Sequence, residues 1–230
     1  MGGQACVFYG AAEFSRDLDL LVLADPENLN LLRVALDDLQ AETIAVPPFD
    51  SAFLAKGHAI HFRCHRADVL EFRIDVMSQL RDGPEFEELW DRRTTIEVED
   101  ETVELMSLED LVKAKKTQCD KDWPMIARLL EQRYFRLGTS PGDREIEFLL
   151  MELRTPELLV DLSSRFPGIA ARVLGVRPAV AEAIVGDIER VRSVLNDEEA
   201  EEKRRDREYW RPLRTEPEQL RHARLLRDRP

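Results

Sequence analysis

Apolar and polar positions in the first part of the chain predict a strand followed by a helix. Segment 18–23 is short and largely apolar, which suits a buried strand. Asp25 followed by Pro26 is typical of a helix start. The apolar face of this helix is predicted from leucines at helical spacing, namely Leu29, Leu32, Leu36 and Leu39. A second strand is predicted at 43–46.

Two hairpins are predicted further along the chain. Segments 59–63 and 69–77 form the first, because apolar and charged residues alternate along 69–77 as they do on a strand with one buried face. The second is predicted around the acidic turn at 99–101. Ser107 then starts a helix, with Asp110 in the position that a capping box uses. The predicted fold class is α+β, a small mixed sheet with flanking helices.

The second part of the chain reads as helix only. Turn-forming residues without an apolar side chain fill 138–142, so we place a linker at 137–142 between a domain at 1–136 and an all-α region at 143–230. One amphipathic helix there is marked by Ile146, Leu149, Leu150 and Leu153, and a longer one by Ile184, Ile188, Val191 and Leu195. The densely charged stretch 196–206 is interpreted as a solvated helix or a mobile tail.

Composition narrows the class of protein. The chain has 230 residues, 43% of them hydrophobic, which is enough for at least one substantial core. Three widely spaced cysteines do not predict a disulfide framework. The sequence lacks both a membrane-length apolar run and a signal-peptide layout, which indicates a cytoplasmic protein with no membrane partner. A net charge of −13 disfavours a broad phosphate-binding surface, but it leaves room for a metal-bridged or locally basic site.

Three aspartates are the strongest candidates for chemistry. Asp17 and Asp19 are two residues apart on a strand, so they share a face with α-carbons about 6.6 Å apart. Asp75 lies on the polar face of another strand and joins them if the two strands are neighbours. Carboxylate oxygens of this kind suit Mg²⁺ or Mn²⁺. The alternative is that each aspartate is ordinary polar surface.

Gly2 and Gly3 precede these carboxylates. A glycine pair opening a helix lets a phosphate group approach backbone N–H groups. Segment 4–9 is compatible with such a short helix. A flexible chain end is the alternative interpretation of the pair.

Together these motifs resemble the DNA polymerase beta-like nucleotidyltransferase superfamily. The pattern is Met1-Gly2-Gly3, thirteen residues, Asp17-Leu18-Asp19-Leu20 and a later strand with Asp75. Ser15 and Arg16 before the first aspartate are similar to the bacterial minimal-nucleotidyltransferase and abortive-infection toxin branches. The resemblance covers about residues 1–134.

The resemblance implies a nucleotidyltransferase core at 1–136 and a role for each motif residue. Gly2 and Gly3 would hold the nucleotide phosphates, with Ser15 beside them. Asp17 and Asp19 would bind Mg²⁺ or Mn²⁺ together with the triphosphate of an NTP. Asp75 would share a metal and help to activate the acceptor hydroxyl. The three aspartates are thus the implied catalytic and metal-binding residues.

Two lysines complete the implied site. In the helix predicted after Ser107, Lys115, Cys119 and Asp122 follow a spacing that places them on one face. The resemblance implies that Lys115, or Lys116 in its place, approaches the nucleotide phosphates. The alternative is that Asp122 caps a new helix and both lysines are surface charge.

The beginning of the chain departs from the family pattern. Relatives carry a helix and a strand before the glycine pair, whereas here Met1 itself stands in the apolar position. Two hypotheses remain open: a start site assigned too late, or a degenerate copy.

The leading hypothesis is a metal-dependent nucleotidyltransferase that moves a nucleoside monophosphate from an NTP to a hydroxyl of RNA, protein or a small molecule, releasing pyrophosphate. The alternative is a noncatalytic module of the same fold that binds a cognate protein partner in a toxin–antitoxin pair. A third hypothesis is an interaction protein whose acidic residues are surface charge.

Zinc binding by His58, His61, Cys64 and His65 is disfavoured, because strand alternation separates them. Near the C-terminal end, a group of arginines with one tryptophan could stack on and neutralise single-stranded nucleic acid. Its members are Arg204, Arg205, Arg207, Trp210, Arg211 and Arg214. A solvated helix is the favoured interpretation, because acidic residues are interleaved with them, namely Glu201, Glu202, Asp206 and Glu208.

Overall fold

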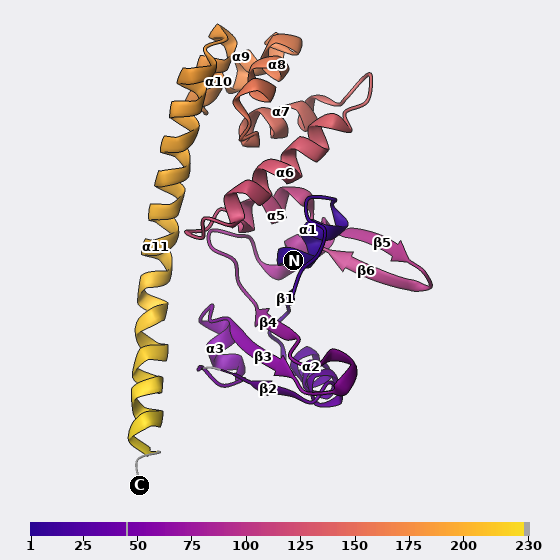
Figure 1. Ribbon diagram of the computed structural model, residues 1–230, viewed down its shortest axis with the longest axis vertical. Helices are drawn as coiled ribbons and strands as arrows, with labels where there is room; N and C mark the ends of the chain where they lie inside the picture. The colour runs from indigo at the N-terminus through magenta and orange to yellow at the C-terminus, as the bar shows by residue number, and fades with distance from the viewer. Residues whose placement is uncertain (45, 228–230) are drawn as a thin grey trace. The chain divides into compact units, whose positions relative to one another are not determined.

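The computed structural model describes residues 1–44 and 46–227 (Figure 1). The chain forms two compact units. The first, called the sheet unit, contains Met1–Phe8, Ala12–Ala114 and the chain from Arg207 onward. The second, called the helical unit, contains Tyr9–Ala11 and Lys115–Asp206. The structure is therefore of the predicted mixed α+β class, with strands in one unit and helices alone in the other.

The sheet unit is built from short elements. Its elements up to residue 114 are α1 (Gly2–Phe8), β1 (Asp17–Leu21), α2 (Pro26–Asp38), β2 (Ala41–Thr43), α3 (Ser51–Ala55), β3 (Ile60–Cys64), the 3₁₀ turn η1 (Ala67–Val69), β4 (Arg73–Met77), α4 (Phe86–Asp91), β5 (Thr94–Val98), β6 (Glu101–Leu105) and α5 (Leu108–Ala114). Strands β1 to β4 form one sheet in the order β1-β4-β3-β2. Strands β5 and β6 form a separate antiparallel pair.

Both predicted hairpins are confirmed in their pairing, but the second strand of the first hairpin is shorter than predicted, because β4 covers Arg73–Met77 rather than 69–77. Leu70 is exposed and Glu71 has a φ of 63°, so the strand alternation predicted before residue 73 is wrong. Strands β3 and β4 pair antiparallel, with Phe62 opposite Ile74, and β5 pairs antiparallel with β6. The parallel neighbour of β4 is β1, which lies at the edge of the sheet. The second predicted strand is displaced: β2 covers Ala41–Thr43 rather than 43–46. The Ile44 N–H adds a hydrogen bond to the His61 carbonyl of β3 at 3.0 Å, and residue 45 lies outside the described residues.

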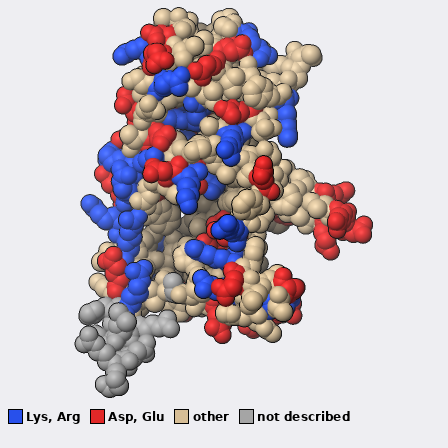
Figure 2. Space-filling model, in the orientation of Figure 1, with Lys and Arg blue, Asp and Glu red and all other residues tan. Residues whose placement is uncertain are grey.

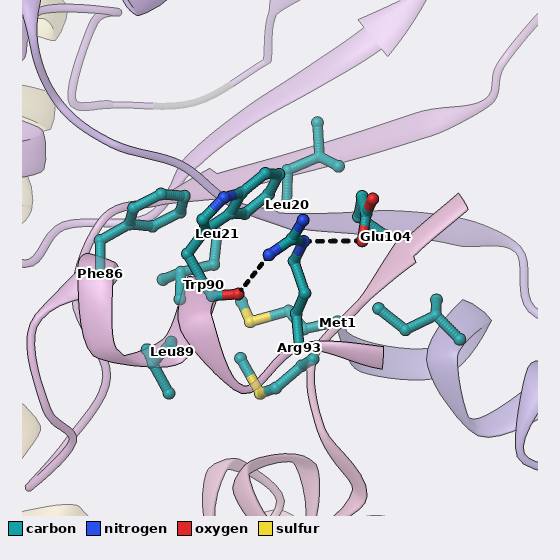
Figure 3. Close-up of a pocket in the computed structure, with 10 residues that line it drawn as sticks. Met1, Leu20, Leu21, Phe86, Leu89, Trp90, Arg93 and Glu104 are labelled. Atoms are coloured by element: carbon teal, nitrogen blue, oxygen red, sulfur yellow. Dashed lines mark hydrogen bonds and ion pairs between the residues drawn. The ribbon is translucent and has the colours of Figure 1, made fainter. Parts of the chain in front are cut away.

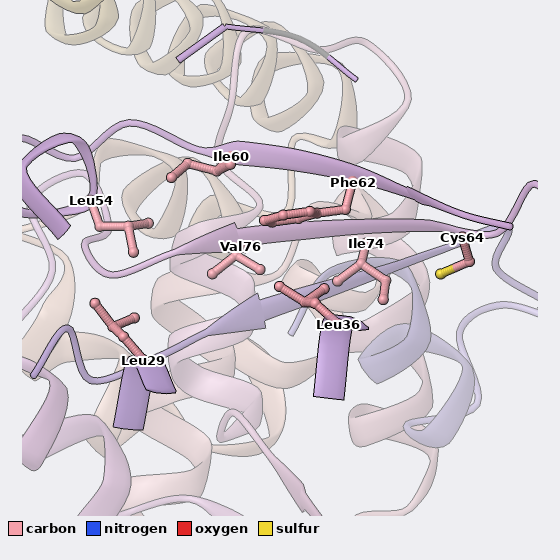
Figure 4. Packing of buried hydrophobic residues seen from close by; sticks show 8 residues of the cluster. All are labelled: Leu29, Leu36, Leu54, Ile60, Phe62, Cys64, Ile74 and Val76. Atoms are coloured by element: carbon pink, nitrogen blue, oxygen red, sulfur yellow. The ribbon is translucent and has the colours of Figure 1, made fainter. Parts of the chain in front are cut away.

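Helix α2 and one face of the four-stranded sheet enclose the core of this unit. Figure 4 shows Leu29 and Leu36 of α2 facing the strand residues. Leu32 and Leu39 pack at the margin of the same cluster, so the predicted leucine face is confirmed. Asp25 starts α2 as predicted, because its carboxylate accepts the N–H groups of residues 27 and 28 at 2.9 and 3.1 Å. The buried members of the cluster are Leu29, Leu36, Leu54, Ile60, Phe62, Cys64, Ile74 and Val76.

The predicted start of α5 is also confirmed. The Asp110 N–H donates to the Ser107 hydroxyl oxygen at 3.1 Å, and that hydroxyl donates to the Asp110 carboxylate at 2.6 Å. Arg92 adds two hydrogen bonds to Asp110, at 2.6 and 2.7 Å. Burial acts to raise the pKa of Asp110, but the hydrogen bonds from Arg92 and Ser107 outweigh it and hold the pKa below its usual value. The carboxylate therefore joins α4 to α5 while ionised.

The helical unit packs five helices and the first part of a sixth. They are α6 (Asp122–Phe135), α7 (Asp143–Glu152), α8 (Pro156–Arg165), α9 (Pro167–Val173), α10 (Pro178–Val185) and α11 (Ile188–Arg227), the last of which continues into the sheet unit. The unit boundary lies after Ala114, not at the predicted linker 137–142. Residues 137–142 only connect α6 to α7. Side-chain contacts tie α6 to the helices that follow, including the Arg133–Glu145 ion pair at 2.7 Å.

The predicted long helix through Ile184 and Leu195 is interrupted. Gly186 adopts a left-handed conformation, with φ of 85°, and ends α10. Ile184 is exposed on α10, whereas Val191 and Leu195 are buried on α11. The charged stretch 196–206 is helical and belongs to α11, so the helical interpretation of that stretch is confirmed.

One buried hydroxyl in α8 predicts a stabilising substitution. Ser163 is 2% exposed, and its Oγ has no hydrogen-bond partner among the described residues. Because an unsatisfied buried polar group costs about 1–3 kcal/mol, we expect Ser163→Ala to raise the free energy of unfolding by about 1 kcal/mol in urea titrations. Ser164→Ala is the control, since that exposed hydroxyl donates to the Asp161 carbonyl at 2.8 Å. A clear loss of stability in Ser163→Ala would contradict the prediction.

None of the described helices combines the length and apolar character that a bilayer crossing requires.

Candidate functional site

The parallel pairing of β1 with β4 brings the three predicted aspartates together. Asp19 and Asp75 are register partners, so their α-carbons lie about 4.8 Å apart and their side chains share a face. Asp17 is paired with Arg73 and lies on the same face, two residues before Asp19. The condition that the two strands be neighbours is therefore met. Asp17 and Asp75 lie on neighbouring strands only because the chain folds back through α2, β2 and β3.

Asp75 is the most enclosed of the three. It is 8% exposed, and Arg73 holds both its carboxylate oxygens, from Nε at 2.7 Å and Nη2 at 2.8 Å. His61 Nδ1 lies 2.8 Å from the same carboxylate. Burial acts to raise the pKa of Asp75, but hydrogen bonds and charge from His61 and Arg73 outweigh it and lower the pKa. Asp75 is therefore ionised and paired.

The glycine pair packs directly on Asp19. Gly2 has a φ of +68°, and a Cβ added there would lie 2.6 Å from the Asp19 Cβ and still closer to its carboxylate. The Gly3 N–H donates to the Asp19 carboxylate at 3.3 Å. The amino group of Met1 donates to the Asp19 carbonyl at 2.8 Å. The structure thus places Gly2 and Gly3 against Asp19, with the Gly3 N–H directed at its carboxylate.

Ser15 is placed beside Asp17. Its hydroxyl lies 3.0 Å from both the backbone and a side-chain oxygen of Asp17. A Cβ added at Gly3 would collide with the Ser15 side chain, 3.0 Å from its Cβ. Ser15 and the glycine pair therefore form one tight contact around the first two aspartates.

Arg73 and His61 belong to this cluster, although the sequence did not single them out for it. Arg73 precedes Asp75 by two residues, so strand periodicity alone places the two side chains on one face. His61 is opposite Asp75 in the β3–β4 pair, and only the strand register shows that. The Arg73 Nη2 and the His61 Nδ1 lie 3.1 Å apart, which completes a three-residue network.

The three aspartates offer the type of ligand that a divalent cation requires. Three carboxylates on one sheet face are the oxygen ligands that Mg²⁺ prefers. No group of three or more His, Cys, Asp or Glu in the described part of the chain is arranged to hold a metal ion, however. Asp75 is paired with Arg73 and His61 instead. The residues fit a cation in kind and in backbone position, and the Arg73 side chain, 43% exposed, would have to leave Asp75 first.

Lys115 and Lys116 lie in the helical unit and are ion-paired there. Lys115 Nζ donates to Asp122 at 2.7 Å, and Lys116 Nζ lies 2.6 Å from Glu152. The predicted single helix carrying Lys115, Cys119 and Asp122 is wrong, because α5 ends at Ala114 and α6 begins at Asp122. The Thr117 hydroxyl bonds Asp122 at 2.6 Å and stabilises the turn between them.

The three histidines of segment 58–65 contact different carboxylates. His61 bonds Asp75, whereas His58 is 4% exposed and its Nε2 lies 2.8 Å from Glu216 of α11. His65 Nε2 is 3.8 Å from Glu42. The histidines thus have separate carboxylate partners.

A mainly apolar pocket adjoins β1 within the sheet unit. Figure 3 shows Met1, Leu21 and Leu89 around it, with Trp90 and Arg93 at one side. Its volume is about 100 Å³. The Arg93 guanidinium stacks on Trp90, 4.1 Å from the ring centre, and its Nε donates to Glu104 at 2.8 Å. Leu20 and Leu21 of β1 line this pocket, whereas none of the three aspartates does.

Comparison with known proteins gave no match to any family model, curated protein or solved structure.

Proposed function

We propose that the protein is a metal-dependent nucleotidyltransferase whose core is the sheet unit. The observation that carries the proposal is the alignment of Asp19 with Asp75 across parallel strands, with Asp17 on the same face. The contact of Gly2 with Asp19 supports it, because a glycine is required where the backbone comes this close to a carboxylate. Acidic residues at unrelated surface positions would not be expected to share one face and one glycine contact.

Each residue of the cluster then has a task. Asp17 and Asp19 would hold Mg²⁺ or Mn²⁺ together with the triphosphate of an NTP. Asp75, once released by Arg73, would help to hold the metal ion and would accept the proton of the acceptor hydroxyl. A bound divalent cation supplies charge stabilisation for the phosphoryl group and its leaving pyrophosphate. The acceptor is a hydroxyl of RNA, protein or a small molecule.

A second candidate is a noncatalytic module with the same fold, which would bind a cognate protein. The observation that favours it is the closed network of Asp75 with Arg73 and His61. A carboxylate held by an arginine on both oxygens is neutralised without a metal ion. In this case the cluster stabilises the junction of β1, β3 and β4.

Ligand-induced stabilisation tests the first candidate without knowledge of the acceptor. Thermal unfolding is measured with each of the four NTPs, with and without Mg²⁺. Ligand that binds only the folded state at ten times its Kd is expected to raise Tm by roughly 3–6 °C. The rise should need Mg²⁺ and should disappear in Asp19→Asn, whose side chain retains an acceptor for the Gly3 N–H but lacks the charge.

Asp37→Asn is the matched control, because Asp37 is an exposed aspartate on α2 of the same unit. It should keep the full Mg²⁺-dependent rise in Tm. The nucleotidyltransferase proposal is refuted if no NTP stabilises the protein at millimolar concentration with Mg²⁺, or if Asp19→Asn responds like the control. Either result favours the noncatalytic candidate.

A further inference from the structure

Helix α11 presents a row of arginines that the aspartate site does not involve. Arg207, Arg211 and Arg214 follow one another at spacings of four and three residues, which places them on one face of the helix. All three are exposed. The row, called the arginine stripe, extends about 10.5 Å along the helix axis, at 1.5 Å per residue. Figure 2 shows Lys and Arg side chains gathered along the middle of α11.

Three carboxylates near the stripe are directed elsewhere. Glu201 accepts hydrogen bonds from Arg204 and Arg205, and these bonds, the one from Arg204 most of all, lower the pKa of Glu201 to about 2. Asp206 is 2% exposed and accepts the Gln118 N–H at 2.9 Å. Glu216 is opposite the stripe and bonds Lys56 at 2.7 Å. Glu201, Asp206 and Glu216 therefore do not cover the arginine face, whereas the exposed Glu208 lies beside it, three residues before Arg211.

The stripe itself has no anionic partner in the described part of the chain. No carboxylate there lies within ion-pair distance of Arg207, Arg211 or Arg214, whereas most arginines of this acidic protein are paired. Glu218 shares the face one turn further on and marks the end of the stripe. Three unpaired guanidinium groups in a row repel one another weakly, and an external anion with repeated charge would relieve that repulsion.

An aromatic side chain lies beside the stripe. Trp210 is three residues after Arg207 and four before Arg214, so its side chain neighbours both on the helix surface. It is partly exposed, and the edge of the neighbouring Tyr209 ring meets it with ring centres 4.9 Å apart. Indole next to guanidinium groups is the combination on which unpaired bases stack while the arginines contact phosphates.

We propose that the arginine stripe binds the backbone of single-stranded nucleic acid, with Trp210 stacking on a base. Charge complementarity and the adjacent aromatic ring favour this partner over a duplex, whose bases are already stacked. The inference does not depend on the proposed nucleotidyl transfer, because it concerns binding by a different surface.

The test is salt-dependent binding of a fluorescein-labelled, mixed-sequence single-stranded RNA of 20 nucleotides, followed by anisotropy. The variant Arg207→Gln/Arg211→Gln/Arg214→Gln removes the stripe. Its matched control is Arg172→Gln/Arg192→Gln/Arg205→Gln, which removes the same charge from exposed arginines that are paired with Asp143, Glu157 and Glu201. Circular dichroism and Tm verify that both variants are folded.

The stripe variant is expected to lower the slope of log K against log salt by about 2, since each single-strand phosphate contact contributes about 0.7. Between 50 and 200 mM salt, the wild-type Kd should therefore rise about 16-fold more than that of the variant. The control should retain the wild-type slope. Lysine at the three positions should also retain it, which distinguishes lost charge from altered folding.

Three results would overturn the proposal: no RNA binding by the wild type at 50 mM salt, equal slopes for the stripe variant and its control, or binding to phosphatidylserine vesicles but not to RNA. Trp210→Ala tests the stacking contact separately. It should weaken RNA binding by at least about fivefold with an unchanged salt slope. An unchanged Kd in Trp210→Ala would overturn the assignment of that residue and the preference for a single strand.

Discussion

Gly2→Ala is expected to lower the free energy of unfolding of the sheet unit by about 2–4 kcal/mol and to abolish nucleotide-induced stabilisation. Two effects add. A φ of +68° is unfavourable for alanine, and the new methyl group would lie 2.6 Å from the Cβ of Asp19. Rotation of the Asp19 carboxylate cannot relieve a contact with Cβ, so the backbone of α1 or β1 must move. Because Ala5 and Cys6 anchor α1 in the core, the strain reaches β1 and displaces Asp19.

Urea titration and the NTP thermal shift measure the two parts of this prediction. Gly10→Ala is the matched control, because Gly10 has a similar φ of +81° and its added Cβ would meet only the end of the Arg136 side chain, at 3.4 Å. It should show the backbone cost of about 1–2 kcal/mol alone and keep the response to NTP. Equal behaviour of the two variants would show that the approach of Gly2 to Asp19 has no functional role.

Glu198→Ala is expected to destabilise the helical unit by about 3–5 kcal/mol, the largest change predicted for this protein. Glu198 holds two enclosed arginines, Arg177 at 2.9 Å and Arg154 at 2.8 Å. Arg177 is 5% exposed and also donates to the carbonyls of Leu150 and Leu153, at 2.8 and 2.9 Å. Burial and then the charge of Arg177 lower the pKa of Arg154. Removing the carboxylate leaves two buried positive charges next to each other.

Thermal and urea unfolding followed by circular dichroism measure this loss. Glu201→Ala is the control, since Glu201 also bonds two arginines but at the surface, where exposed ion pairs contribute little. Its unfolding curve should nearly overlay that of the wild type. Similar curves for Glu198→Ala and Glu201→Ala would contradict a structural role for the buried network. Nucleotide binding by the sheet unit offers a second readout that the loss of Glu198 should not abolish at low temperature.

The aspartate cluster and the arginine stripe differ in how much of each the sequence predicts. The aspartates share a face by strand periodicity, so Asp17 and Asp19 could be paired from their spacing alone. The arginines share a face by helical periodicity, which the sequence also predicts. The sequence does not predict whether these arginines are available to a ligand. It gives the number of nearby carboxylates but not the directions in which Glu201, Asp206 and Glu216 point.

Several errors of sequence interpretation have a common origin in turn geometry. Lys115 and Asp122 were placed on one helix because their spacing is helical, but the side chains of Thr117 and Asp122 close a turn between α5 and α6. Gly186 in a left-handed conformation likewise separates Ile184 from the helix that carries Val191. Spacing predicts a shared face only while the chain remains one element, and short polar turns decide where elements end.

The sequence by itself determined the α+β class, the leucine face of α2, the hairpins, the Ser107 cap and the candidate aspartates, because each depends on neighbours within a few residues. The tertiary structure alone decided that β1 pairs with β4, which brings Asp19 beside Asp75. It also decided that Arg73 and His61 bond Asp75, and that the arginine stripe has no carboxylate partner among the described residues. These features depend on contacts between residues far apart in the chain, which local periodicity does not specify.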